Sequence, residues 1–593
     1  MLRPYAVAGL LVVAVLAAHG GALHGGFHYD DSSAITENPA IRTWRPMEYI
    51  VSGYRPMAVL SFALNYQLGG LTPRGYLLTN LGLHALASVL VFLLAREVLG
   101  DLRWAAVSGA LFALHPINAE SVNYATARFS LLATVGAVAA AWAFIRYAER
   151  RDGPWTLVIG LGAFAAALLS KESAVALAVP LLAARWLLPS LRRQNTRLVV
   201  AASAYSAVVV LFLAWHLILG AGYDGESVGT REPAPRPFWT FTEMVARSLA
   251  LWVWPSPLGL DHRLTFLLRF DARLAAALVV GAVALAAVFV ILARRAPAAA
   301  WGLLWALAGL APLAPLPWIT AVGLLQENRM GFSAAGLALT TASLAGAAWM
   351  RFGRARFGRA LRWSVVGAGV VLAVAAVVVD RSRSVVWQDD RRLWQEVVDR
   401  SPENVLAHLN LGAANMAQGE YALAEAEFRA IQRVLPDYPR VYYLIGLLAE
   451  RRGRADEAKA AFERAIALHP LDESAHVQLG VLALRAGDTH GAEAMFQRAL
   501  DINPGQRDAL NNLAAIYLER QDFAEALDLT TAALQGDPAF LEAAYNRGLA
   551  LAALGRRTEA ETVLGDVERR FPRDPAFDRY RDGIRTVLNG TAP

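Results

Sequence analysis

The sequence has no cysteine, few charged residues for its length, and no convincing cleavage site after its first apolar run. The absence of cysteine in 593 residues excludes disulfide bonds, cysteine–zinc sites and cysteine nucleophiles. Charged residues make up 18% of the chain and hydrophobic residues 56%, with a mean hydropathy of +0.36. This composition indicates membrane-embedded sequence, and the length predicts at least two domains.

The apolar and the charged residues occupy different parts of the chain. Up to about Asp380 the sequence is rich in Ala, Val, Leu and Trp, interrupted by short arginine clusters, and beyond it charged residues recur at helical spacing. The net charge of +6 requires no nucleic-acid partner, because much of the arginine lies between apolar runs, where it orients membrane helices. The run from Tyr5 to about Ala18 follows Arg3 and is predicted to be an uncleaved signal anchor.

Apolar runs predict about eleven transmembrane helices, since one span needs ~20 apolar residues. Arginine clusters follow the fourth, sixth, eighth and tenth runs, and all four lie on one side if the N-terminus is cytoplasmic. An odd number of spans then places the C-terminal domain outside the cytoplasm. The segment 238–254 would invert the later clusters if it spanned, so we expect a re-entrant or interfacial helix. The eleven runs lie near residues 5–22, 75–95, 104–119, 127–146, 155–170, 173–190, 198–219, 274–293, 299–317, 332–350 and 363–380.

The last third of the chain repeats every 34 residues. Small residues, alanines and prolines recur in register over five units that start near residues 405, 439, 473, 507 and 541, and phenylalanines recur in the first three. This is the tetratricopeptide signature, in which small residues let two helices approach and proline ends the second helix. Residues 385–404, with Trp387, Leu393, Trp394 and Val397, are predicted to form a half-repeat linker. The predicted fold is therefore all-α: a membrane helix bundle over 1–384 followed by a repeat solenoid over 405–593.

One repeat position carries more than packing residues. The sixth position of each unit reads Asn410, Leu444, Gln478, Asn512 and Asn546. This position faces the inner groove, where a carboxamide can donate to and accept from an extended peptide backbone. The four carboxamides are therefore predicted to bind an acceptor peptide, in a ladder that resembles that of the cytosolic O-GlcNAc transferase. Leu444 interrupts the ladder, and a solvated helix face remains the alternative interpretation.

Polar residues accumulate on the side of the membrane predicted to be outside. Asp30 and Asp31 lie in the first outer loop, which spans 21–74, and a carboxylate there can act as a general base. Ionisable groups at membrane depth are costly and indicate a polar cavity. Acids and cations together suit a base with a clamp for a departing phosphate. The predicted binding groups are Arg55, His84, His115, Glu120, Arg128, Lys171, Glu172 and Arg329.

These residues, in this order, resemble the transmembrane-and-tetratricopeptide (TMTC) O-mannosyltransferases and their bacterial relatives, within the GT-C glycosyltransferase superfamily. The sequence departs from the family at residues 326–333 (QENRMGFS), where relatives usually have Glu-Arg-Tyr-Leu-Tyr. Arg329 is displaced there and the tyrosines are absent. Besides the repeats, the matching stretches are Phe27–Asn38, Arg55–Tyr66, Gly75–His84, Leu114–Arg128 and Ser170–Glu172.

The resemblance implies a GT-C-type fold and an inverting sugar transfer from a polyprenyl-phosphate donor to a Ser/Thr hydroxyl of an extracytoplasmic protein. The sugar would be mannose or another hexose, with the donor phosphate near Lys171 and near Arg329 or Arg128. We predict Asp30 as the base and Asp31 as its positioning group, although the sequence does not separate their roles. A divalent metal held by carboxylates is a less favoured alternative, because no second acidic cluster has ligand spacing.

Two other functions remain open from the sequence. An enzyme of the same fold could glycosylate a lipid or a polysaccharide, or the chain could be a non-catalytic membrane scaffold whose repeats assemble envelope proteins. The charged residues on the predicted outer face favour an enzyme, since a pure anchor has no need of buried Lys and Glu. The expected location is the inner (cytoplasmic) membrane, with a cytoplasmic N-terminus and the repeats in the periplasm.

Overall fold

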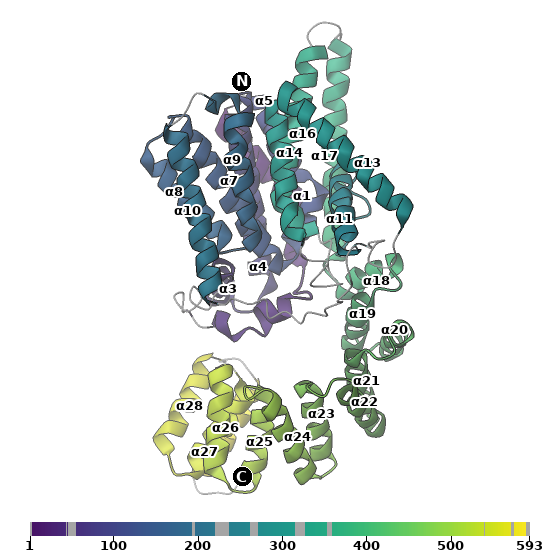
Figure 1. Ribbon diagram of the computed structural model, residues 1–593. Helices are drawn as coiled ribbons and strands as arrows, with labels where there is room; N and C mark the ends of the chain where they lie inside the picture. Colours follow the sequence, from purple (N-terminus) through teal and green to yellow (C-terminus); the bar gives the residue numbers. More distant parts are fainter. Residues whose placement is uncertain are drawn as a thin grey trace. The chain divides into compact units, whose positions relative to one another are not determined.

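The computed structural model describes residues 3–42, 44, 55–192, 196–219, 236–260, 262, 271–314, 327–352, 359–538, 540–570 and 575–588. Every regular element in these ranges is helical, as the sequence predicts. The chain divides into two compact units, Met1–Pro402 and Glu403–Pro593, which we describe separately (Figure 1). Arg354 and Arg356, in the arginine cluster that follows the tenth predicted run, lie outside the described residues.

The first unit contains the predicted apolar runs as helices of two lengths. Seven apolar helices in the described ranges are long enough to cross a membrane by length and composition. Three others, α5 (Leu102–Leu114), α8 (Pro154–Leu168) and α14 (Pro297–Leu310), are shorter. The seven long helices are α1 (Pro4–His19) with its 3₁₀ extension η1 (Gly20–His24), α4 (Pro73–Leu99), α7 (Arg128–Ala148), α10 (Thr196–Leu219), α13 (Ala272–Arg295), α16 (Gly331–Phe352) and α17 (Arg359–Val386).

The sixth predicted run, 173–190, does not form one long helix. It is a 3₁₀ segment, η6 (Glu172–Leu177), followed by α9 (Ala178–Leu187) and a short 3₁₀ turn. Ser170 to Glu172 and Pro180 lie in this stretch, and proline has no backbone N–H to donate within a helix. The structure therefore interrupts the apolar sequence next to Lys171, where the sequence analysis places a binding group.

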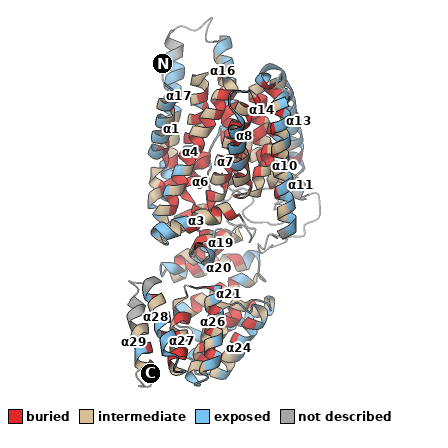
Figure 2. Cartoon of the chain, turned by 90° about the vertical axis from the view of Figure 1, so that its left-hand side faces the viewer, coloured by how far each residue is buried: buried red, intermediate tan, exposed pale blue. Residues whose placement is uncertain are grey.

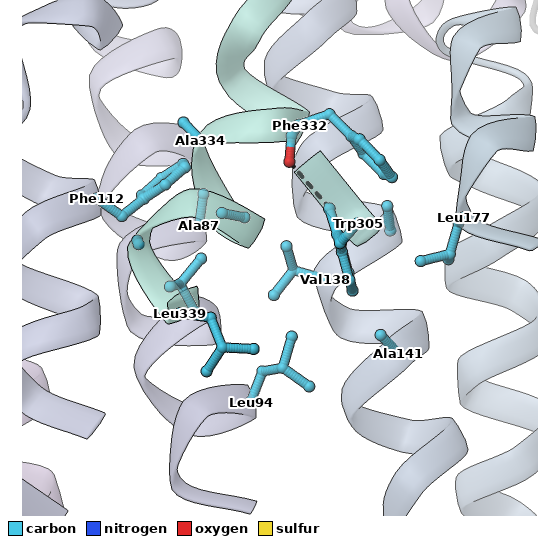
Figure 3. Packing of buried hydrophobic residues seen from close by; sticks show 14 of the residues in the cluster. Ala87, Leu94, Phe112, Val138, Ala141, Leu177, Trp305, Phe332, Ala334 and Leu339 are labelled. Carbon is cyan, nitrogen blue, oxygen red and sulfur yellow. Dashed lines mark hydrogen bonds between the residues drawn. The ribbon is translucent and has the colours of Figure 1, made fainter. Parts of the chain in front are cut away.

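The centre of this unit is a close packing of α4, α7, α14 and α16. Gly302 and Gly336 permit the approach of α14 and α16, since a Cβ on Gly336 would lie 2.5 Å from the Gly302 carbonyl oxygen. Figure 3 shows the buried Trp305 of α14, whose indole N–H donates to the Phe332 carbonyl at 2.9 Å. In contrast, α13 and α17 are mostly exposed along their apolar length, as lipid-facing helices would be (Figure 2).

Helix α11 (Arg236–Val253) covers the segment that the sequence analysis excludes from the spans. It is amphipathic: Glu243 and Ser248 are buried against the protein, whereas Phe238 and Val253 are among its exposed apolar residues. Arg247 pairs with Glu243 across one helical turn at 2.8 Å. A helix with such a polar buried face is suited to an interface rather than to a lipid-surrounded span.

The second unit consists of the predicted helix pairs and a final capping helix. A Cβ on Gly412, Gly446 or Gly480 would lie 2.3–2.5 Å from the phenylalanine ring of the second helix of the same pair. Glycine is therefore required at these positions for the observed approach. The helices are α19 (Val405–Ala417), α20 (Tyr421–Val434), α21 (Pro439–Arg451), α22 (Ala455–Leu468), α23 (Glu473–Arg485), α24 (Thr489–Ile502), α25 (Arg507–Glu519), α26 (Phe523–Gly536), α27 (Leu541–Ala553), α28 (Arg557–Arg570) and α29 (Pro575–Leu588).

The segment predicted as a half-repeat linker belongs with the membrane helices in the structure. It forms α18 (Asp390–Arg400), in which Leu393, Trp394 and Val397 are buried. Asp389 caps the helix by accepting from the Arg391 backbone N–H at 2.9 Å. The compact unit ends at Pro402, so α18 is part of the first unit although the chain continues directly into the repeats.

Candidate active site

The loop after η1 places its two acidic residues in different environments. Asp31 is fully buried: one carboxylate oxygen accepts from the His28 backbone N–H at 2.9 Å. The other accepts from the backbone N–H and the hydroxyl of Thr126 at 2.8 and 2.9 Å. Burial raises the pKa of Asp31 to about 6, although these hydrogen bonds oppose the shift. Asp31 therefore joins the loop to the segment before α7 and has no oxygen open to a substrate hydroxyl.

Asp30, in contrast, keeps an accessible side chain while protein atoms surround it. Its backbone N–H donates to the Tyr124 hydroxyl at 3.1 Å, and its carboxylate also interacts with that hydroxyl. Partial burial raises the pKa of Asp30, against the lowering effects of Tyr124 and of the positive charges of Arg329 and Arg55. A carboxylate with a raised pKa, accessible and close to cations, can accept a proton from a bound hydroxyl.

Arg55 and Glu172 form an ion pair beside this loop. The guanidinium donates to both carboxylate oxygens of Glu172 at 3.2 Å and lies 4.9 Å from the centre of the Phe129 ring. Arg55 precedes α3 (Pro56–Gly69) with a φ of +47°, in the left-handed region that is costly for a residue with a side chain. The ion pair and the ring contact hold this conformation, so the arginine is fixed in place next to Asp30.

Lys171 lies within the same set of charges. Its ammonium group donates to the Ser130 hydroxyl at 2.7 Å. Burial lowers the pKa of Lys171 to about 7, and the positive charges of Arg55 and Arg329 add to that effect, against Glu172 and Glu120. Burial and the two arginines thus disfavour the protonated form of Lys171. A bound donor phosphate would place a negative charge beside Lys171 and would therefore favour the protonated form of the lysine.

Glu120 and the turn η9 (Glu327–Met330) complete the polar cluster. Glu120 accepts from the backbone N–H and the side-chain amide of Asn328 at 3.1 and 2.6 Å. Glu327 accepts from the Gly259 N–H at 2.6 Å and is 3.1 Å from His262. Burial and the nearby Glu327 carboxylate raise the pKa of Glu120. These contacts hold the turn that carries Arg329 next to the segment 115–124.

Among the described residues, no three His, Asp or Glu side chains form a group that could hold a metal ion.

The structure therefore brings together six of the ten residues predicted for catalysis and donor binding. Asp31 anchors the loop that carries Asp30, through its hydrogen bonds to His28 and Thr126. The six are Asp30, Arg55, Glu120, Lys171, Glu172 and Arg329. Sequence reasoning did not single out Tyr124, Thr126 and Ser130, which contact Asp30, Asp31 and Lys171. Tyr124 and Thr126 lie inside the stretch Leu114–Arg128 that carries the family resemblance, and this was the available signal.

Two predicted binding histidines are engaged elsewhere. His115 stacks on Trp252 of α11 with ring centres 4.1 Å apart, and its Nε2 is 2.8 Å from the Trp252 carbonyl oxygen. His84 is fully buried against His19, and its Nε2 is 3.2 Å from the Ala113 carbonyl oxygen. Both rings have packing and hydrogen-bond partners within the protein. We therefore do not retain them as donor-binding residues.

Arg128 also differs from its predicted role. It is completely buried, with its three guanidinium nitrogens directed at protein oxygens: Nε at Asn80 (2.9 Å), Nη1 at Asn65 (2.5 Å) and Nη2 at the Tyr76 carbonyl (2.6 Å). The Phe62 ring lies 4.7 Å from the guanidinium carbon. Each guanidinium nitrogen thus has a protein acceptor, and Arg128 fastens α3, α4 and α7 to one another instead of being exposed to a phosphate.

Replacing Arg128 by methionine is expected to destabilise the protein rather than to weaken donor binding. The change leaves buried oxygens of Asn65, Asn80 and Tyr76 without their donor, and the expected loss is ~2–4 kcal/mol. The measurement is thermal unfolding of the purified protein in detergent, with Arg103→Met as a control because Arg103 is exposed. A stable Arg128→Met variant with a strongly raised donor KM would contradict this assignment.

The carboxamides of the repeat ladder make several contacts within the repeats. The Asn410 amide donates to the Leu406 carbonyl of its own helix at 2.8 Å, and the Asn546 amide donates to Asn511 at 2.9 Å. Gln478 hydrogen-bonds Tyr443 of the preceding unit. Leu444, at the interrupting position, is buried. Asn410, Gln478 and Asn546 thus each make one hydrogen bond within the repeats, and they stay, with Asn512, the predicted peptide-binding positions.

Comparison with known proteins gives matches to both units. Residues 55–218 match the family of dolichyl-phosphate-mannose-protein mannosyltransferases. Residues 391–439, 443–507, 477–539 and 517–579 match tetratricopeptide repeats. The segment 55–218 includes Arg55, Glu120, Lys171 and Glu172 of the polar cluster. The first repeat match begins within α18, at the first unit's C-terminal end.

Curated proteins with related sequences cover only part of this chain. Protein O-mannosyl-transferase Tmtc1 of Drosophila melanogaster is 37% identical over 169 residues, 26% of this chain and 19% of the relative. The mouse proteins TMTC3 and TMTC2 are 34% and 31% identical, each over 28% of this chain, and over 20% and 22% of their own lengths. The chain thus aligns with about a fifth of each relative. The chain therefore combines a segment similar to dolichyl-phosphate-mannose-protein mannosyltransferases with tetratricopeptide repeats, and it is similar over part of its length to the protein O-mannosyl-transferases Tmtc1, TMTC2 and TMTC3.

Proposed function

We propose that this protein is a membrane glycosyltransferase that moves a hexose, mannose in the first instance, from a polyprenyl-phosphate donor to a Ser or Thr hydroxyl of an extracytoplasmic protein. One observation carries the proposal: Asp30 is an accessible carboxylate that interacts with the positive charges of Arg55 and Arg329, and the buried ammonium group of Lys171 interacts with the same two arginines. Arg55 and Lys171 belong to the segment that matches a family of dolichyl-phosphate-mannose-protein mannosyltransferases.

The proposed reaction is a single displacement at the anomeric carbon. Asp30 takes the proton of the acceptor hydroxyl while the hydroxyl oxygen forms a bond to that carbon. The bond between the anomeric carbon and the phosphate oxygen breaks, and its electron pair leaves with the polyprenyl phosphate. Attack from the side opposite the leaving group inverts the anomeric configuration. The proton on Asp30 then passes to solvent.

The three cations would stabilise the departing phosphate. Negative charge on the phosphate increases as the bond to the sugar breaks, so a fixed positive charge lowers the energy of the transition state more than that of the bound donor. Arg55 is already oriented by Glu172, and the turn carrying Arg329 is held by Glu120. Orientation before the reaction matters because the protein then needs no rearrangement as charge develops.

The repeats would present the protein acceptor, and the arginine clusters between apolar runs support an extracytoplasmic location for them. Tetratricopeptide grooves commonly bind extended peptides, and Gln478, Asn512 and Asn546 offer groups that can pair with a peptide backbone. This arrangement would put the acceptor hydroxyl on the same side of the membrane as Asp30. The expected membrane is the inner membrane of a bacterial cell.

The function can be tested with the full chain purified in lipid nanodiscs. Polyprenyl-phosphate mannose and a library of Ser/Thr peptides are supplied, and mass spectrometry measures hexose addition; parallel reactions with EDTA test the alternative of a carboxylate-bound metal. In cells that lack the gene, loss of hexose from envelope proteins supports the proposal. An unchanged set of glycoproteins with altered polysaccharide would favour a carbohydrate acceptor, and no change in either would favour a scaffold.

A further inference from the structure

Helix α18 packs directly on the loop that carries Asp30. The Trp394 side chain of α18 is buried, and its ring meets Tyr29 edge-on at 5.6 Å between centres. Trp387, at the junction of α17 and α18, contacts the His28 ring at 5.6 Å and stacks on Tyr124 at 5.5 Å. Tyr124 is the residue whose hydroxyl contacts Asp30. His28 and Tyr29, which precede Asp30, and Tyr124, which contacts it, therefore all pack against the segment 387–394.

His28 makes the polar link between the loop and this helix. Its ring Nδ1 is 2.6 Å from a carboxylate oxygen of Asp390, the first residue of α18. Its backbone N–H donates to Asp31 at 2.9 Å, and the residue is only 4% exposed. One residue thus connects α18 to the buried carboxylate that anchors the loop.

The residue between His28 and Asp30 has an unfavourable backbone. Tyr29 has a φ of +44°, in the left-handed region, which costs a residue with a side chain roughly 1–2 kcal/mol. Such a conformation persists when neighbouring contacts impose it. Here the contacts on either side are the His28–Asp390 hydrogen bond and the Tyr29–Trp394 ring contact. Loss of these contacts would let Tyr29 relax and would turn Asp30 away from its present direction.

We propose that His28 is a positioning residue for Asp30, and that its hydrogen bond to Asp390 makes α18, the helix with which the repeat match begins, a support for the catalytic loop. The inference rests on the proposed function of Asp30 as the base. The position of Asp30 would therefore depend on the packing of α18 against the loop that contains His28 and Tyr29. The sequence that leads into the acceptor-binding repeats therefore also holds the catalytic loop.

The protonation of His28 makes the link dependent on pH. Burial would lower the pKa of His28, but the hydrogen bond and charge of Asp390, the charge of Asp31 and the Trp387 carbonyl outweigh it and raise the pKa. The titratable groups that face the ring are Asp31 from its own loop and Asp390 from α18. At pH values below this raised pKa the His28 ring is protonated and its interaction with the Asp390 carboxylate is strongest. The interaction weakens as the pH rises through that pKa.

Four variants of the full chain test the proposal. His28→Ala and Asp390→Ala remove the link. His28→Asn keeps an N–H donor near the Nδ1 position but does not titrate. Asp399→Asn is the matched control, since it removes an exposed carboxylate from the other end of the same helix. The measurements are kcat, KM and their pH profiles for sugar transfer, and amide hydrogen exchange of residues 27–37 in detergent.

In His28→Ala and Asp390→Ala we expect kcat to fall by about tenfold or more, since small displacements of a catalytic group have large effects. The donor KM should change little, and exchange of the loop amides should become faster. We expect kcat of the wild type to decline as the pH rises through the pKa of His28. His28→Asn should retain more activity than His28→Ala and should lack that decline. Asp399→Asn should behave as the wild type in every measurement.

Two results would overturn the inference. Wild-type exchange of the loop amides in both alanine variants would show that α18 does not hold the loop. Faster exchange with unchanged kcat and an unchanged pH profile would show that His28 has a structural role only. Hydrogen exchange does not depend on activity, so it tests whether α18 holds the loop even if the wild-type protein transfers no sugar. An absence of sugar transfer by the wild type would refute the proposed function and not this inference.

Discussion

Replacing Asp30 by asparagine is expected to reduce kcat for sugar transfer by a factor of ~10²–10⁴, the usual contribution of a general base. Asparagine has nearly the same shape as aspartate and keeps an oxygen that can interact with the Tyr124 hydroxyl, so the fold should be retained. It cannot accept the proton of the acceptor hydroxyl. The donor KM should change much less than kcat, because the phosphate interacts with cations rather than with Asp30 in the proposed site.

The pH profile gives a second signature of this base. Asp30 must be deprotonated to act, and its pKa is raised by its surroundings. The value of kcat/KM for the wild type should therefore fall on the acid side, with a midpoint above the usual value for aspartate. The residual activity of Asp30→Asn should lack that acid limb. Transfer rates measured between pH 4 and 8 in one buffer system of constant ionic strength are the required data.

Asp31→Asn is the matched control at the adjacent position, and it should fail in a different way. Its new amide group would face donors, either the His28 N–H or the N–H and hydroxyl of Thr126. The expected result is a loss of stability of ~1–3 kcal/mol, seen as a lower unfolding temperature. If sugar transfer persists in both Asp30→Asn and Asp31→Asn, the assignment of the base is wrong.

Much of the fold follows from the sequence, because it depends on patterns that are local along the chain. The 34-residue period predicts the helix pairs, and the apolar runs predict the membrane helices. Run length alone, however, does not separate long helices from short ones. The run at 173–190 contains a single charged residue, Arg185, yet it breaks into a 3₁₀ segment and a short helix. Hydropathy does not report backbone geometry, whereas Pro180 within the run has no N–H to donate in a helix.

The site was less predictable, because its residues differ in what they contact rather than in type. Arg128 and Arg55 have the same side chain and the same predicted role. One is enclosed by the oxygens of Asn65, Asn80 and Tyr76, whereas the other pairs with Glu172 at the edge of the cluster. Likewise, Asp30 and Asp31 are neighbours in sequence, but the turn of the loop buries only the second. Those distinctions arise from tertiary packing.

Replacing Lys171 by glutamine is expected to lower kcat/KM by a factor of ~10²–10³, the usual effect of removing one group that stabilises developing charge. The same change should leave the unfolding temperature unchanged or raise it. The reason is that burial and two nearby arginines disfavour a positive charge at this position. Activity and stability should thus move in opposite directions, as expected for a residue whose unfavourable environment serves a ligand. Transfer kinetics and thermal unfolding of one preparation provide both measurements.

The pH dependence of this effect has a defined sign. Because the pKa of Lys171 is lowered to about 7 in the folded protein, the folded state loses this proton before the unfolded state does, and the destabilisation is relieved as the pH rises above 7. The stability gain of Lys171→Gln should therefore be largest below pH 7 and should shrink above it.

Donor binding should show the opposite preference, since an anionic phosphate favours the protonated lysine. The donor KM of the wild type is expected to be constant below about pH 7 and to increase above it. Lys171→Arg should abolish this increase, because arginine keeps its charge throughout the range. Lys171 is one of two lysines in the chain, the other being Lys459 in the repeats. A donor KM with the same pH dependence in the wild type, Lys171→Arg and Lys171→Gln would exclude Lys171 as the phosphate-binding cation.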